Sequence, residues 1–132
     1  MESGYSGTPQ LKKLGIAAGT RLLVVGAPAG WAFESEPVGI EDVAPDAPAD
    51  VIVAFCRSAA EVELHVSTLG ERIRPAGALW IAWPRKAAGH VSDVTENLLR
   101  DVALPLGLVD VKVAAIDTDW SGLKLVWRRE NR

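Results

Sequence analysis

Three short apolar runs without polar alternation constrain the fold of this chain more than any other feature. They are Arg21 to Gly26, Asp50 to Cys56 and Ala78 to Trp83. Strands that are covered by other elements on both faces have this pattern, because neither face meets water. Helical patterns lie between the runs, and alternation of strands with helices is typical of a parallel sheet. We therefore predict an α/β protein with a mostly parallel sheet.

The helices are predicted from their capping residues. Thr8-Pro9 is a suitable helix start and Gly15 a plausible stop, while Ser58 with Glu61 three residues later forms a capping box for a helix that runs to about Arg74. A third helix, capped by Ser92 or Asp93, is expected to align four apolar residues on one face. These residues are Val91, Val94, Leu98 and Val102.

Two segments carry different signals. From Ala27 to Asp50 prolines interrupt the pattern, so we expect only a weak strand from Val38 to Val43 and at most a short helix around Trp31 to Ser35. At the other end, a short loop separates the strand from Val109 to Ile116 from the strand from Leu123 to Trp127, which predicts an antiparallel hairpin. That ending occurs in methyltransferase-like Rossmann sheets. We expect a single three-layer Rossmann-like α/β domain over residues 1–132.

Composition limits the partners and the compartment. The net charge of −3 gives no overall field that favours nucleic acid, and no apolar run approaches the roughly 20 residues of a membrane helix. The start of the chain lacks the pattern of a secretory signal, so the expected compartment is the cytoplasm. Cys56 is the single cysteine and is expected to be inert in the core, since neither His65 nor His90 is near it in sequence.

Polar residues gather where the predicted parallel strands end. Ligands of open parallel sheets bind outside the carboxyl ends of the strands, and the amides at helix starts favour anions. We therefore predict one ligand-binding site at this edge. The alternative is that these loop residues are polar only because they are exposed to solvent. The candidate ligand-binding residues are Tyr5, Ser6, Thr8, Gly26, Arg57, Trp83, Arg85, Lys86, Asp93, Asp119, Trp120 and Lys124.

Three blocks of the sequence carry a resemblance. They are Gly4-Tyr5-Ser6-Gly7-Thr8-Pro9, Ala82-Trp83-Pro84-Arg85-Lys86 and Trp120-Ser121-Gly122-Leu123-Lys124. With these blocks the chain resembles, over nearly its whole length, a bacterial family of short proteins of unknown function. The resemblance implies a bacterial origin and no particular activity.

Three functions remain open. The favoured interpretation is a non-catalytic Rossmann-like module that binds a small anionic ligand or a protein partner at the predicted edge. The first alternative is a small methyltransferase that uses S-adenosylmethionine, with Glu41 or Asp42 as the ribose contact. Its turn from Gly26 to Gly30 has a proline in the middle and does not match a cofactor loop.

The second alternative is a homodimer built on partly exposed tryptophans, namely Trp31, Trp83 and Trp120. No zinc spacing or nucleophile elbow is present in the sequence. The sequence leaves open whether Trp31 and Phe33 fill the space after the first strand.

Overall fold

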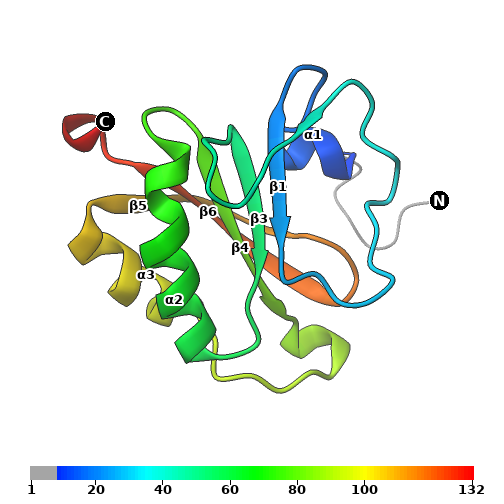
Figure 1. Cartoon of the computed structure of the whole chain (residues 1–132). Helices are drawn as coiled ribbons and strands as arrows, with labels where there is room; N and C mark the ends of the chain where they lie inside the picture. The colour runs from blue at the N-terminus through cyan, green and yellow to red at the C-terminus, as the bar shows by residue number, and fades with distance from the viewer. Residues whose placement is uncertain (1–8) are drawn as a thin grey trace.

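The computed structural model describes residues 9–132, which form a six-stranded sheet with helices on both faces (Figure 1). The strand order is β2-β1-β3-β4-β6-β5. Strands β1 to β4 pair in parallel, whereas β6 pairs antiparallel with both β4 and β5. The strands are β1 (Arg21–Val25), β2 (Glu41–Asp42), β3 (Val51–Phe55), β4 (Ala78–Pro84), β5 (Leu108–Ala115) and β6 (Trp120–Trp127).

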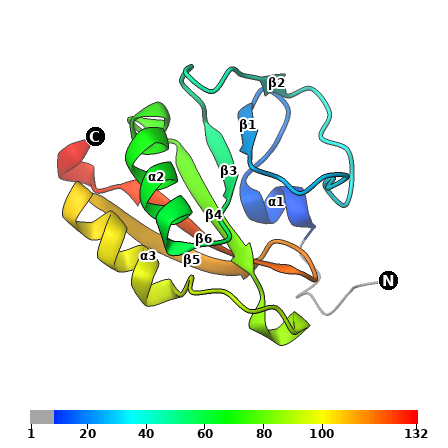
Figure 2. The ribbon, with the colours of Figure 1, turned by 60° about the horizontal axis from the view of Figure 1, so that its bottom comes forward.

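The described residues also contain three α-helices and four short 3-10 helices. The helices are α1 (Gln10–Leu14), α2 (Ala59–Leu69) and α3 (Glu96–Ala103), and the turns are η1 (Gly70–Ile73), η2 (Lys86–Ala88), η3 (Leu104–Leu106) and η4 (Arg129–Asn131). Figure 2 shows α2 and α3 on one side of the sheet and α1 on the other. Within the described residues, no helix is long and apolar enough to cross a membrane.

Each face of the sheet has its own apolar core. On the side of α2 and α3, Val62, Val66 and Leu99 pack with Ile52 and Leu79. On the side of α1 the core contains the largest fully buried side chains, Trp80 and Phe55, together with Leu14 and Ile116. The apolar runs are thus covered on both faces, which confirms the main sequence prediction.

The local signals for two helices are confirmed. Gly15 closes α1 in the left-handed conformation with φ of 79°. The hydroxyl of Ser58 accepts a hydrogen bond from the backbone N–H of Glu61 at 3.2 Å, which is one half of the predicted capping box. The carboxylate of Glu61 accepts from the N–H of Arg57 rather than from that of Ser58. The antiparallel pairing of β5 with β6 confirms the predicted hairpin.

Other local predictions were wrong. Thr95 caps α3, because its hydroxyl accepts from the N–H of Leu98, so the helix begins later than Ser92 or Asp93. Val91 consequently lies outside the helix and is 95% exposed. The strand expected from Val38 to Val43 is limited to the two residues of β2, because the neighbouring prolines lack the N–H group that a strand ladder needs. No helix forms around Trp31 to Ser35, which is compatible with the expectation of at most a short one.

Candidate functional site

The structure brings several predicted residues together at the carboxyl edge of the parallel strands. The guanidinium of Arg57 donates to the carbonyl of Gly26 at 3.2 Å and lies 5.4 Å from the ring centroid of Trp120. Gly26 itself has φ of 71°, and a Cβ there would lie 3.0 Å from the carbonyl oxygen of Phe55. Glycine is therefore required by the close approach of this turn to β3.

Hydrogen bonds between loops occupy other predicted residues. Arg85 donates to the carbonyls of Asp117 and Thr118 at 3.4 and 3.3 Å. The carboxylate of Asp119 lies 3.0 Å from His90 Nε2. The carboxylate of Asp93 accepts from the N–H of Ala59 at 3.0 Å and so caps α2. These contacts join the loops into one rim and account for much of its polar character.

Two pockets lie near this edge among the described residues, and of these two only the second is lined by predicted candidate residues. The first, the β1 pocket, has a volume of about 450 Å³ and is lined by Val24, Ala27, Trp31, Ala32, Phe33, Glu34, Ser35, Glu36 and Pro37. The second, the rim pocket, has about 330 Å³ and is lined by Trp83, Arg85, Lys86, Ala87, Val94, Thr95, Glu96 and Ser121. The two lie on opposite faces of the sheet, because Trp31 packs on the α1 core and Trp83 on the α2 and α3 core.

Not every predicted residue reaches the edge. Lys124 pairs with Trp80 in the middle of β4, whereas Trp120 pairs with Pro84 at the edge. Placing Lys124 in the site was therefore wrong. Tyr5, Ser6 and Thr8 lie outside the described residues, and their predicted roles stay predictions.

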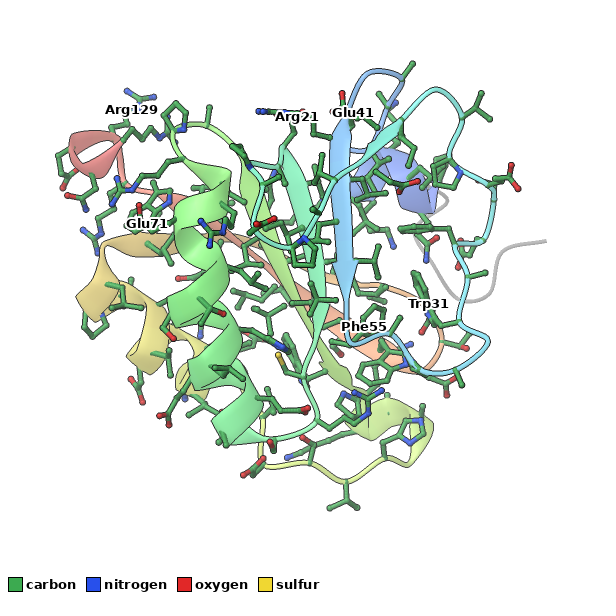
Figure 3. All side chains as sticks on the ribbon, in the orientation of Figure 1. Arg21, Trp31, Glu41, Phe55, Glu71 and Arg129 are labelled. Atoms are coloured by element: carbon green, nitrogen blue, oxygen red, sulfur yellow. The ribbon has the colours of Figure 1, made fainter. Side chains whose placement is uncertain are left out.

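Aromatic rings cover the ends of β1 and β3. The centroid of the Trp31 ring lies 4.9 Å from those of Phe33 and Phe55, both edge-on. The indole N–H of Trp31 donates to the carboxylate of Asp117 at 2.9 Å, and Figure 3 shows Trp31 beside Phe55 at this edge. These rings fill the space directly above the strands, and the β1 pocket opens beside them.

The other tryptophans are more buried than the sequence suggested. Trp83 and Trp120 are only 8% and 9% exposed. The prediction of partial exposure at these two positions was wrong, because both rings pack into the cores of the sheet. A dimer surface built on tryptophans would therefore retain only Trp31, whose side chain is half-buried.

Sequence reasoning missed the residue that fixes the wall of the β1 pocket. Gln10 is 4% exposed, donates to the carbonyl of Ile116 at 2.7 Å and accepts from the N–H of Glu34 at 2.8 Å. It therefore joins α1, the end of β5 and the pocket segment. Its spacing of four residues from the buried Leu14 places both on one helical face, and that spacing was the available signal.

Lys13 is a second buried polar residue on α1. Its ammonium donates to the carbonyl of Ala115 at 3.0 Å. Burial lowers the pKa of Lys13, while the negative charge of Glu34 acts in the opposite direction. Glu34 thus belongs to the electrostatic surroundings of both α1 and the β1 pocket.

The acidic residues offered for a ribose lie at the wrong end of the sheet. Glu41 and Asp42 pair with Arg21 and Leu22, at the start of β1. Figure 3 shows Glu41 beside Arg21, far along the strand from Trp31. The ribose assignment was therefore wrong. Because β2 ends at Asp42, the later part of β1 has no strand on that side, and the β1 pocket forms next to Val24.

Cys56 has a histidine neighbour, contrary to the sequence expectation. The thiol Sγ lies 3.2 Å from His65 Nδ1, because α2 folds back along β3. Burial raises the pKa of Cys56 to about 12, and burial lowers the pKa of His65. Both groups are therefore neutral near neutral pH, which agrees with an inert core thiol. Among the described residues, no cluster of three or more His, Cys, Asp or Glu is arranged to hold a metal ion.

Comparison with solved structures identifies the fold. A Methanococcus jannaschii fibrillarin pre-rRNA processing protein aligns with 94% of this chain and 70% of its own at 14% identity, with a TM-score of 0.57. An S-adenosylmethionine-dependent methyltransferase from Aquifex aeolicus aligns over 87% and 86% at 16% identity and a TM-score of 0.56. The sheet is a methyltransferase-like Rossmann fold.

A third structure shares this methyltransferase-like fold. The magnesium protoporphyrin IX methyltransferase of Synechocystis PCC 6803, solved with bound S-adenosylmethionine, aligns over 89% of this chain and 74% of its own, with 14% identity and a TM-score of 0.59. No protein-family model and no curated protein matches the sequence. The predicted fold class is confirmed, and these low identities establish the fold alone.

Proposed function

We propose that this chain binds S-adenosylmethionine in the β1 pocket. The observation that carries the proposal is a ligand-sized pocket at the carboxyl end of β1, the region where open parallel sheets bind their ligands. Its volume of about 450 Å³ falls within the roughly 300–1,000 Å³ of small-molecule sites. Solved neighbours named as S-adenosylmethionine-dependent methyltransferases support this alternative better than the non-catalytic interpretation.

The residues that line the pocket suit this ligand chemically. Trp31 and Phe33 offer aromatic surface to a purine, and an aromatic face also attracts a sulfonium cation. The carboxylates of Glu34 and Glu36 are acceptors for ribose hydroxyls and add negative charge near a positive sulfur. When bound, S-adenosylmethionine supplies a methyl group attached to that sulfur. Two carboxylates and no cation line the described pocket, which disfavours an anionic ligand.

The pocket departs from the usual cofactor site of Rossmann sheets in three ways. The turn after β1 contains Pro28 in place of a glycine pattern, the acidic residues of β2 lie at the far end, and no helix follows β1. In our proposal the aromatic rings and carboxylates of residues 31–37 contact the ligand in place of the glycine turn, the acidic residue of the second strand and the helix after the first strand. Gln10 fixes its backbone at Glu34, so the lining is held in place before a ligand arrives.

Calorimetric titration with S-adenosylmethionine and its demethylated product tests the proposal. We expect saturable binding that weakens at least about tenfold, roughly 1.4 kcal/mol, in Glu34→Gln with Glu36→Gln. The matched control is Glu41→Gln with Asp42→Asn, which removes the same two charges at the opposite end of the sheet and should bind as the wild type does. No heat at millimolar ligand, or equal weakening in both double variants, would contradict the proposal.

The rim pocket supports a second candidate, a non-catalytic module for a small anion. Arg85 and Lys86 line it together with two hydroxyl residues, Thr95 at the start of α3 and Ser121 on β6. Glu96 also lines it, and its carboxylate is paired with Arg100 at 3.0 Å. A thermal-shift titration with inorganic phosphate separates the candidates, because a ligand of the folded state raises the melting temperature. Stabilisation by phosphate that Lys86→Glu abolishes, and that the Glu34 and Glu36 variant retains, would favour this function. Absence of any phosphate effect would dismiss it.

A further inference from the structure

A groove lies between α2 and α3, on the face of the sheet opposite the β1 pocket. It has a volume of about 730 Å³ and is lined by Ala60, Glu63, Leu64, Ser67, Asp101, Val102, Pro105 and Leu106. Leu64 is 58% exposed and Leu106 is 46% exposed. Two large apolar side chains therefore face water in one concave place, where association with a partner would bury them.

The charges around the groove have one sign. Glu63 and Asp101 line it, and among the described residues of its lining there is no Lys or Arg. Arg100, on α3 next to Asp101, already binds Glu96 at 3.0 Å and Asp110 at 2.9 Å. Its positive charge is thus paired within the chain, so the groove itself presents an apolar floor with negative charge.

We propose that this groove binds a basic amphipathic helix of a protein partner. An apolar helix face places residues at i, i+3, i+4 and i+7 into such a groove between two helices, and flanking Lys or Arg residues complement Glu63 and Asp101. A second copy of this chain fits less well. In a symmetric dimer through the groove, the acidic lining of one copy would face the equally acidic lining of the other. The proposal is independent of ligand binding in the β1 pocket.

Fluorescence polarisation with two labelled helical peptides tests the proposal. Both peptides have the same leucine positions, and they differ only in Lys or Glu at the remaining positions. We expect the Lys peptide to bind with micromolar affinity and the Glu peptide at least about tenfold more weakly. Leu64→Glu should abolish binding of the Lys peptide, and Glu63→Lys with Asp101→Lys should reverse the preference between the peptides.

A matched control separates groove binding from general charge attraction. Glu41→Lys with Asp42→Lys makes the same change in net charge far from the groove and should leave the affinity for the Lys peptide within about twofold at physiological salt. Circular dichroism checks that Leu64→Glu stays folded. Failure of the Lys peptide to bind, equal weakening in the control, or an unchanged preference after charge reversal would overturn the proposal. A dimer in sedimentation that Leu64→Glu dissociates would also overturn it, in favour of self-association.

Discussion

Replacing Gln10 by leucine should destabilise the protein and loosen the β1 pocket. The side chain bridges the carbonyl of Ile116 at 2.7 Å and the N–H of Glu34 at 2.8 Å while being 4% exposed. A buried acceptor that loses its partner costs about 1–3 kcal/mol. Ile116 is fully buried, so its carbonyl bears this cost, whereas Glu34 is exposed and its N–H can bind water. We therefore expect a loss of roughly 2 kcal/mol.

Urea unfolding followed by tryptophan fluorescence measures this loss. The midpoint should fall while the slope with denaturant stays constant, because the surface exposed on unfolding barely changes. Lys12→Leu is the control, since Lys12 is exposed on the same helix and should change stability by no more than about 0.5 kcal/mol. Affinity for S-adenosylmethionine should also fall in Gln10→Leu. A Gln10→Leu protein as stable as the Lys12→Leu control would refute the reasoning about the bridge.

Three further predictions concern the stability of the fold around β1, β3 and α2. Gly26→Ala should lower the free energy of unfolding in urea by about 1–3 kcal/mol, and by more than Gly30→Ala does. Both glycines have positive φ, but only Gly26 lies against the carbonyl of Phe55. Equal losses in the two variants would contradict the role of that contact. The thiol of Cys56 should resist Ellman's reagent until the chain unfolds, and rapid labelling of the folded protein would refute this. The free energy of unfolding should also fall as pH rises from 9.0 towards about 12, because the unfolded thiol ionises in this range while the folded one stays protonated. Burial lowers the pKa of His65, so the unfolded state binds a proton at a higher pH than the folded state does. The free energy of unfolding should therefore fall as pH drops below 6.5, and should fall less in His65→Gln. Identical pH slopes for the wild type and His65→Gln would contradict this role of His65.

The parts of the fold that could be predicted are those whose signals are local. The run from Val51 to Phe55 became a strand buried at every position, because continuous apolar sequence leaves no face for water. Ser58 with Glu61 marked the start of α2, since both hydrogen-bonding groups lie within one turn. The short loop between the last two strands left room only for a hairpin.

The parts that could not be predicted depend on contacts between distant residues. Trp31 takes its position from Asp117, and no local pattern between Ala27 and Asp50 indicates that pairing. The sequence Trp120-Ser121-Gly122 resembled a loop, but a Cβ at Gly122 would lie 2.5 Å from the side chain of Ile116. This glycine permits close packing inside β6. The strand begins at Trp120 rather than at the expected Leu123, so Lys124 lies within the strand and not at the edge of the sheet where ligands bind.

His65 shows a signal that was present but unused. It lies three residues after Val62 and directly before Val66, so it stands close to the buried stripe of α2. A helix that returns along a strand ending just before Cys56 brings such a residue towards the thiol. The position of His65 on the helical face of α2, rather than its separation from Cys56 in the sequence, was the signal that it would lie near the thiol.

The measurement that tests the central claim most directly is a titration of the isotope-labelled protein with S-adenosylhomocysteine, followed by amide and indole NMR signals. Our account predicts that the indole N–H signal of Trp31 and the backbone signals of Phe33 to Glu36 shift together and saturate, while those around Lys86 and Thr95 stay in place. Unchanged spectra at millimolar ligand would contradict the claim that the β1 pocket binds this ligand. Shifts confined to the residues of the rim pocket would contradict it equally and would assign ligand binding to the opposite face of the sheet.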